Sequence, residues 1–387
     1  MAVISQLNLP RILRVGGGAS QELRATLAQL GLSKPLIVTD PFIRSRAFFD
    51  AIVGTVPDLD VAADVFADCV PDPTTDSVRA GLAALIAKDY DCLIAIGGGS
   101  SMDTAKAMAA MQGRSEPMRQ YKVPYALDSG LPIIAIPTTA GTGSEATKFA
   151  VITDTETQEK MLWIGLALMP VAALVDYELT VEMPYRLTAD TGLDTLCHAL
   201  EAFVSRKANA FTDPIALDAM RSVVTYLPKA CADPSNREAR EAMMLAATQG
   251  GVAFANASVT LIHGMSRPIG AHYHVPHGLS NAMLLPEITA WSLPGAQVRY
   301  AIASRHMGFA AQDSDDSTAC DALISGLRRL CSDLSVPTPA SYGIDPDSWR
   351  ANVTLMAEQA LASGSPNNNP RVPSAAEIVD LYRRVFE

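Results

Sequence analysis

The stretch that decides the fold is residues 94–106, which read Ile-Ala-Ile-Gly-Gly-Gly-Ser-Ser-Met-Asp-Thr-Ala-Lys. A short apolar run ends at three glycines, and helix-forming residues follow. Gly97, Gly98 and Gly99 let the backbone approach a diphosphate, and the helix that begins near Ser100 offers N–H groups to an anion. The pattern differs from G-x-G-x-x-G, so a tight turn that serves packing alone is the alternative.

Four apolar runs in the first half of the chain predict strands. They cover residues 36–39, 92–96, 133–136 and 172–175, with helix-like stretches such as 77–87 and 103–111 between them. Apolar strands that alternate with helices are typical of a mostly parallel sheet covered on both faces. We therefore expect an α/β dinucleotide-binding domain over residues 1–183.

A second polar turn follows the apolar run at 133–136. Residues 137–145 read Pro-Thr-Thr-Ala-Gly-Thr-Gly-Ser-Glu. The carboxyl ends of parallel strands meet at one edge of a sheet, where ligands bind in this architecture. Asp40 also ends a predicted strand, and there it can accept a hydrogen bond from a ribose 2′-OH and disfavour a 2′-phosphate. This favours NAD over NADP, although an aspartate before Pro41 can serve the turn alone.

The second half of the chain predicts helices. Helical spacing or strong helix formers cover residues 187–205, 214–227, 238–255, 297–306, 319–334 and, at the end, 375–386. We expect an all-α domain over residues 184–387.

Composition excludes several function classes. The 387 residues are 49% apolar and 18% charged, with a net charge of −11, which argues against nucleic acid or an anionic membrane as the partner. The longest apolar run, residues 162–175, is too short to span a bilayer and contains Pro170. Six cysteines without a CxxC pair indicate reduced thiols. A cytoplasmic location is the expectation.

Histidines cluster in the second half, where five of the six fall between residues 198 and 277. Asp194 and His198 are four residues apart in a predicted helix, so they share a face and can chelate one cation. With His263 and His277 they form a ligand set that suits Fe²⁺, Zn²⁺ or Mn²⁺. Each histidine can instead be an ordinary polar side chain, and His272 and His274 are expected to line the pocket or lie in a turn.

These residues together resemble a known family. The motifs Gly97-Gly98-Gly99-Ser100-x-x-Asp103-x-x-Lys106, Pro137-Thr138-Thr139-x-Gly141-Thr142-Gly143-Ser144-Glu145, Asp194-x-x-x-His198-Ala199-x-Glu201 and His263-Gly264-Met265 through Pro276-His277-Gly278 resemble those of the iron-containing (group III) alcohol dehydrogenases. They occur in the family's order and cover nearly the whole chain.

The resemblance implies an α/β NAD-binding domain followed by an all-α metal domain, an architecture similar to dehydroquinate synthase. It implies an NAD(H)-dependent alcohol dehydrogenase or aldehyde reductase in which a divalent metal, Fe²⁺ first, polarises the oxygen of a small alcohol or aldehyde for hydride transfer. A homo-oligomer, such as a dimer, is also implied. The implied metal ligands are Asp194, His198, His263 and His277, and the implied NAD contacts are Asp40, Gly97, Gly98, Gly99, Ser100, Asp103, Thr138, Thr139, Thr142 and Lys160.

One position departs from the family's pattern. Arg267 stands where many members carry a second histidine, and an arginine is no ordinary acid or base near neutral pH. Arg267 can be a helix-face ion-pair partner, or it can hold a substrate carboxylate, which would make the chain a reductase of a keto acid or semialdehyde. His272 or His274 would then relay the proton.

Two rival functions belong to other classes. An NAD-using lyase of the dehydroquinate synthase type would need a basic pocket, and the candidate pocket residues are too apolar and too poor in lysine. A binding or regulatory protein that keeps the fold without turnover is the second rival, and only Arg267 favours it.

Overall fold

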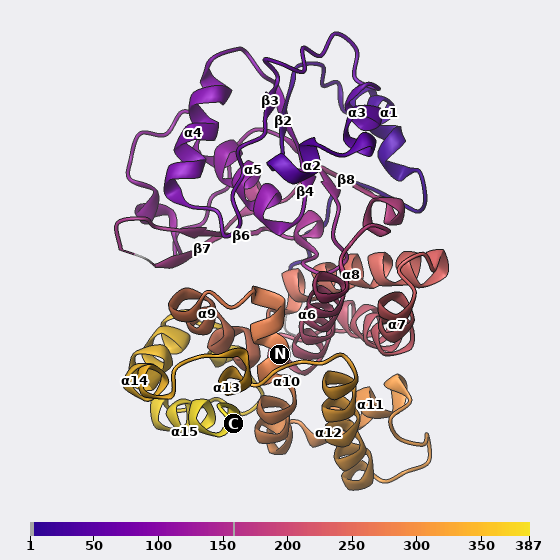
Figure 1. Cartoon of the computed structure of the whole chain (residues 1–387), viewed down its shortest axis with the longest axis vertical. Helices are drawn as coiled ribbons and strands as arrows, with labels where there is room; N and C mark the ends of the chain where they lie inside the picture. The colour runs from indigo at the N-terminus through magenta and orange to yellow at the C-terminus, as the bar shows by residue number, and fades with distance from the viewer. Residues whose placement is uncertain (1–3, 158) are drawn as a thin grey trace. The chain divides into compact units, whose positions relative to one another are not determined.

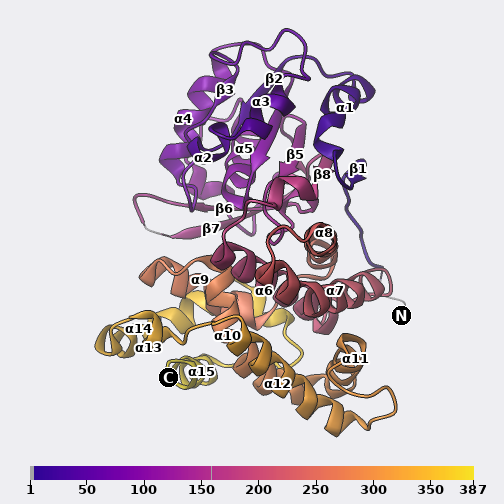
Figure 2. The same cartoon turned by 45° about the vertical axis from the view of Figure 1, so that its right-hand side comes forward.

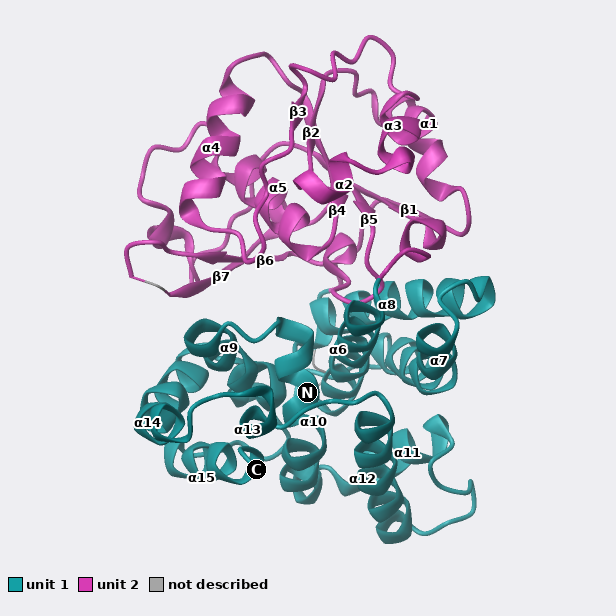
Figure 3. Cartoon of the chain, viewed as in Figure 1, with its two compact units in different colours: residues 1–6, 184–387 teal, residues 7–183 magenta. Residues whose placement is uncertain are grey.

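The computed structural model describes residues 4–157 and 159–387. They form two compact units (Figure 3): residues 7–183, and residues 184–387 together with residues 4–6 of the N-terminal segment. The first three residues of the predicted α/β domain lie outside the described residues.

A six-stranded parallel sheet organises the first unit (Figure 1), with strand order β1-β8-β5-β4-β2-β3. The strands are β1 (Ile12–Val15), β2 (Pro35–Val38), β3 (Val65–Phe66), β4 (Cys92–Gly97), β5 (Ile133–Pro137) and β8 (Ala172–Val175). The four strands predicted from the sequence are the four inner strands, which are buried along their whole length. The edge strands β1 and β3 escaped prediction because they are short and only partly buried.

Helices cover both faces of this sheet (Figure 2). Helix α1 (Leu23–Leu30) and helix α3 (Ala47–Val53) pack in one core with Ile94 and Ile134 of the inner strands. Helices α4 (Thr75–Ile86) and α5 (Gly99–Met111) cover the other face, and α2 (Pro41–Arg44) is a single turn after β2. Burial of both faces explains why the inner strands read as continuous apolar runs rather than alternating ones.

A β-hairpin beside the sheet was not predicted. Strands β6 (Phe149–Thr153) and β7 (Lys160–Ile164) pair antiparallel, with every second residue buried. In the sequence, residues 162–164 of β7 form the start of the long apolar run 162–175, which continues into the buried segment before β8 and so hides the hairpin.

The second unit is helical, as predicted. Its helices are α6 (Tyr185–Val204), α7 (Thr212–Ala232), α8 (Arg237–Ala257), α9 (Leu261–Tyr273), α10 (His277–Ser292), α11 (Gln297–Met307), α12 (Asp316–Asp333), α13 (Pro339–Tyr342), α14 (Pro346–Ala362) and α15 (Ala375–Val385). Four of these helices were not predicted: α9, α10, α13 and α14. Pro268 and Pro286 lie inside α9 and α10, and proline normally signals a helix end. The predicted α/β domain followed by an all-α domain is confirmed.

Across residues 4–157 and 159–387, no single helix has the length and hydropathy of a membrane span. Only α8 and α9 taken together reach that threshold, and the chain bends by 106° between them.

Candidate active site

Four side chains singled out from the sequence lie together in the helical unit. Asp194 and His198 project from α6 one turn apart, His263 comes from the first turn of α9, and His277 begins α10. One ligand atom from each lies within 4.8 Å of all the others. The Nε2 atoms of His198, His263 and His277 lie 3.7, 3.4 and 3.9 Å from Asp194 Oδ1. Three imidazole nitrogens therefore surround one carboxylate oxygen.

The side chain of Asn281 lies next to three of the four side chains of this cluster. Its Nδ2 lies 2.7 Å from Asp194 Oδ1, 3.1 Å from His263 Nε2 and 3.3 Å from His277 Nε2. Because one amide nitrogen lies within 3.3 Å of all three atoms, they face one small volume. A carboxylate and three imidazoles around such a volume fit a divalent cation of the Fe²⁺ or Zn²⁺ kind.

Burial and charge oppose each other at this cluster. Burial acts to raise the pKa of Asp194, but the neighbouring imidazoles, His198 first, more than offset it and hold that pKa well below the usual range. Burial lowers the pKa of His198 to about 3, which keeps its ring neutral. Burial also acts to lower the pKa of His263, yet the carboxylates of Glu201 and Asp194 raise it to about 9. An ionised carboxylate and a neutral imidazole are the forms that bind cations.

Close helix packing brings these residues together. A Cβ added at Gly278 would lie 2.5 Å from the carbonyl oxygen of Asp190, so the start of α10 fits against α6 only with a glycine there. The His198 ring stacks between Phe254 of α8 and His263, at centroid distances of 4.3 and 4.6 Å. The site therefore depends on α6, α8, α9 and α10 at once.

Sequence reasoning gave no role to two residues of this cluster, Glu201 and Asn281. Glu201 lies on α6 and contacts His263 Nδ1, and Asn281 lies on α10. A spacing signal existed for both, because Glu201 follows His198 by three residues and Asn281 follows His277 by four. Residues at these spacings share one face of a helix.

The two glycine-containing turns of the first unit also lie side by side. Gly97 pairs with Pro137 across β4 and β5, and Thr138 N donates to the carbonyl oxygen of Gly97 at 3.0 Å. A Cβ on Gly98 would lie 3.3 Å from Thr139 Cγ2, and one on Gly99 would lie 3.0 Å from Thr142 Cγ2. Gly97 has a φ of +155°, which L side chains rarely adopt.

The first turn of α5 can receive an anion. The N-cap of the helix is Gly98, and no side chain among the described residues caps it. The early N–H groups of a helix carry a partial positive charge and need a partner. Together with the threonines of the second turn, this edge of the sheet suits a diphosphate.

Two predicted NAD contacts of this edge already have partners within the unit. Asp40 Oδ1 accepts from Ile43 N at 2.9 Å and so caps α2, while its Oδ2 accepts from Ser101 Oγ at 3.3 Å. Asp103 accepts from Ser144 Oγ at 3.0 Å and from Val151 N at 2.9 Å. Asp40 thus borders the glycine turn, whereas Asp103 ties α5 to β6.

Lys160 lies on β7, where its Nζ pairs with Asp72 Oδ1 at 2.9 Å. Asp72 belongs to the Pro-Asp-Pro-Thr loop at residues 71–74. The structure brings these two distant segments together, and the contact of Lys160 with NAD stays a prediction.

The three predicted catalytic residues lie outside the four-residue cluster. Arg267 Nη1 donates to Ser365 Oγ at 3.0 Å, and burial lowers the pKa of its guanidinium to about 10, so it stays charged at neutral pH. His272 Nε2 lies 2.9 Å from Gln359 Oε1 of α14. His274 is exposed and ends α9 with a left-handed backbone. Their roles in catalysis stay predictions.

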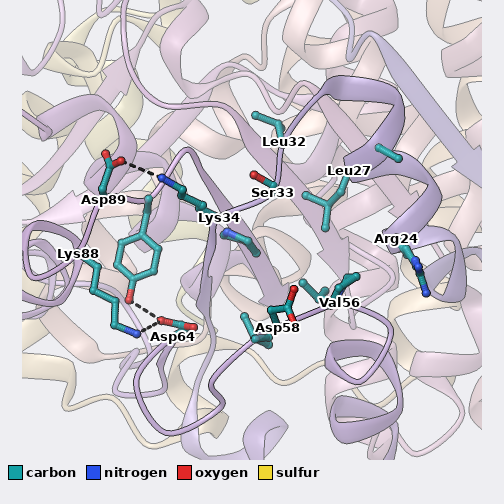
Figure 4. A pocket seen from close by; sticks show the side chains of 15 residues that line it. Arg24, Leu27, Leu32, Ser33, Lys34, Val56, Asp58, Asp64, Lys88 and Asp89 are labelled. Carbon is teal, nitrogen blue, oxygen red and sulfur yellow. Dashed lines mark hydrogen bonds and ion pairs between the residues drawn. The ribbon is translucent and has the colours of Figure 1, made fainter.

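A cavity of about 430 Å³ in the first unit lies at the other edge of the sheet (Figure 4), lined by residues that precede β2, β3 and β4. Four of its charges pair with one another, Lys34 with Asp89 and Lys88 with Asp64. Both glycine turns follow β4 and β5, at the carboxyl ends of the strands. This cavity lies at the amino ends, so it is not part of the predicted nucleotide site.

The fold and the site define a class: an α/β unit with a glycine-lined sheet edge, continued in the same chain by a helical unit with a candidate cation centre. Two family models match the chain, one described as iron-containing alcohol dehydrogenase over residues 10–177 and one as the C-terminal region of that family over residues 188–386. The chain belongs to the iron-containing alcohol dehydrogenase family. It is an oxidoreductase of the alcohol dehydrogenase type.

Individual relatives agree along the full length. The chain is 34% identical to an NAD-dependent methanol dehydrogenase of Bacillus methanolicus over 380 residues, which covers 98% of this chain and 99% of the relative. A crystal structure of 1,3-propanediol oxidoreductase matches with a TM-score of 0.91 and 31% identity, covering 99% and 100%. Sulfoacetaldehyde reductase from Bifidobacterium kashiwanohense in complex with NAD⁺ matches with a TM-score of 0.88 and 27% identity over the whole of both chains.

Proposed function

We propose that this chain is an NAD(H)-dependent alcohol dehydrogenase or aldehyde reductase that acts on a small alcohol or aldehyde. The observation that carries the proposal is the convergence of Asp194, His198, His263 and His277 on one volume. A divalent cation held there, Fe²⁺ with Zn²⁺ or Mn²⁺ as alternatives, would supply Lewis-acid polarisation of the substrate oxygen. A cytoplasmic location and a homodimer stay predictions.

The chain's own residues supply binding and orientation. Asp194, ionised by its surroundings, and His198, kept neutral by burial, are ready to hold the cation. We assign the nucleotide to the glycine-lined edge, with the diphosphate at the start of α5 and Asp40 near the adenosine ribose. This assignment uses Gly97–Ser100, Thr138, Thr139 and Thr142. The NAD-linked relatives support NAD(H) as the carrier of the hydride.

The test pairs metal analysis with NADH absorbance on purified wild type and Asp194→Ala. We expect about one divalent metal per wild-type chain, little in the variant, and a loss of kcat/KM of at least about 100-fold, since Lewis-acid polarisation is worth several kcal/mol. Asp190→Ala is the matched control, because Asp190 lies one turn earlier on α6 and pairs with Arg186. Metal-free wild type that turns over at full rate would refute the metal role.

A second candidate is the reduction of an acidic aldehyde or keto acid. A charged guanidinium at Arg267 favours it, as does the likeness to a sulfoacetaldehyde reductase. In this candidate Arg267 attracts the anionic group, and His272 or His274 moves the proton.

A further inference from the structure

A buried carboxylate lies behind the candidate cation centre. Glu201 of α6 is 1% exposed. Its Oε1 accepts two hydrogen bonds from α9, one from Thr260 Oγ1 at 2.6 Å and one from Ile262 N at 2.7 Å. Its Oε2 contacts Nδ1 of His263. Burial of a charge is costly unless it is paired and hydrogen-bonded, and here each carboxylate oxygen has a partner.

The two nitrogens of the His263 ring point to opposite sides and contact different residues. Nδ1 faces the Glu201 carboxylate, while Nε2 lies 3.4 Å from Asp194 Oδ1 and 3.1 Å from Asn281 Nδ2. An ionised carboxylate only accepts hydrogen bonds. The Glu201 oxygen lies closer to the ring than Asp194 Oδ1 does, and Asp194 Oδ1 already accepts from Asn281 Nδ2 at 2.7 Å, so the proton of a neutral His263 ring belongs on Nδ1. That tautomer leaves the lone pair of Nε2 pointing into the cluster.

We propose that Glu201 is a positioning residue, which fixes the tautomer and ring orientation of His263 and so aims its Nε2 at a divalent cation. The proposal rests on the proposed function above, in which these four side chains bind a metal. A carboxylate behind a ligating imidazole also raises the basicity of that ligand, and loss of such a partner typically weakens metal binding 10- to 100-fold.

His198, the neighbouring histidine, has no carboxylate hydrogen-bonded to its Nδ1 among the described residues. His198 Nδ1 is buried and has no hydrogen-bond partner among the described residues. Its ring is held by stacking against Phe254 and His263 instead. Of these two buried ligands, only His263 therefore has its tautomer set by a carboxylate.

The variant Glu201→Gln reverses the tautomer without changing the side-chain size. Ile262 N–H can only donate, so the carbonyl oxygen of the new amide must stay at the position of Oε1. Its NH₂ group must then face His263 Nδ1, which becomes an acceptor, and the ring proton moves to Nε2. Thr260→Val is the matched control, because it removes one bond to Oε1 and keeps the contact between Oε2 and His263.

The experiment titrates metal-free wild type, Glu201→Gln and Thr260→Val with Co²⁺ against a competing chelator. We expect the dissociation constant to rise 10- to 100-fold in Glu201→Gln and about threefold or less in Thr260→Val. Long-range ¹H–¹⁵N spectra of histidine-labelled, metal-free protein at pH 10 should show the proton of His263 on Nδ1 in wild type and on Nε2 in Glu201→Gln.

Equal losses of affinity in the two variants, or a wild-type His263 with its proton on Nε2, would overturn the inference. The wild-type spectrum decides even where Glu201→Gln does not fold. If wild type binds no divalent cation, the proposed function fails separately, because the spectra report the tautomer without metal.

Discussion

Two buried histidines in contact with each other show how neighbours rather than residue type decide a charge state. Burial disfavours the imidazolium form of both His198 and His263. The charges of Asp194 and Glu201 act on both rings, but they do not offset burial at His198. His263 is also hydrogen-bonded to both carboxylates, and there the direction of the pKa shift is reversed. The cluster thus combines a ring that is neutral before metal arrives with a ring that must release a proton to bind it.

The prediction that the substrate carries an anionic group rests on Arg267. In Arg267→Ala, KM for acidic aldehydes or keto acids should rise about 10-fold or more, since a charge-assisted hydrogen bond is worth about 1.5–3 kcal/mol, while KM for neutral aldehydes changes little. Steady-state NADH assays with a matched acidic and neutral pair measure this. Equal effects on both substrates would eliminate the role of Arg267 as an anion anchor and leave its bond to Ser365 Oγ as structural.

Between elements, the approach of α10 to α6 controls where His277 lies. The helices meet where Gly278 faces the backbone of Asp190, with Asp194 Cβ 3.4 Å from the position that a Cβ would take. A backbone carbonyl cannot swing away as a flexible side chain can. The geometry of the candidate cation centre therefore depends on the absence of a side chain at Gly278.

Gly278→Ala should destabilise the protein by about 1–3 kcal/mol through overpacking and weaken metal binding, because α10 must shift with His277 at its start. Gly250→Ala on α8 is the control. There the nearest atoms to a new Cβ are Thr195 Cγ2 and His198 Cβ at 3.5 and 3.6 Å, which is ordinary contact. Helix propensity then predicts a gain of up to about 1 kcal/mol.

Urea unfolding and metal titration of both variants measure these effects. A Gly278→Ala variant as stable as wild type, with unchanged metal affinity, would show that α10 can move without cost.

In the chain as a whole, the two candidate binding functions belong to different units. All four candidate ligands come from α6, α9 and α10 of the helical unit, whereas both glycine turns belong to the sheet unit. A cation at the cluster would join three helices whose ligands are separated by up to 83 residues in sequence, from Asp194 to His277.

Removal of metal with a chelator should therefore loosen the helical unit selectively. Hydrogen exchange should speed up in α6 and at the starts of α9 and α10, while amides of β4 and β5 keep their protection. A ligand present at 100 times its dissociation constant stabilises by about 2.7 kcal/mol, so the melting temperature should also fall. Asp194→Ala should show no response to the chelator. Equal loss of protection in both units would contradict this prediction.

Much of the fold could be predicted from local patterns. The four inner strands read as apolar runs because both of their faces are buried, and most long helices showed their spacing or composition. Edge strands, the β6–β7 hairpin and the proline-containing helices α9 and α10 could not be predicted in this way. Their signals are short, partly exposed or interrupted, and packing against neighbours decides them.

The amino-acid order fixed which residues could do the chemistry: the pair Asp194 and His198 on one helix face, the glycine turns after buried strands, and the family motifs. Only the folded chain decided which distant residues meet. Examples are the contacts of Glu201 with His263, of Asn281 with Asp194 and of Lys160 with Asp72. The reason is that helical and strand periodicity report contacts within one element. Spacing places Glu201 on the helix face of His198 and Asn281 on that of His277. The contacts that these side chains make with other elements depend on close packing, which local spacing does not record.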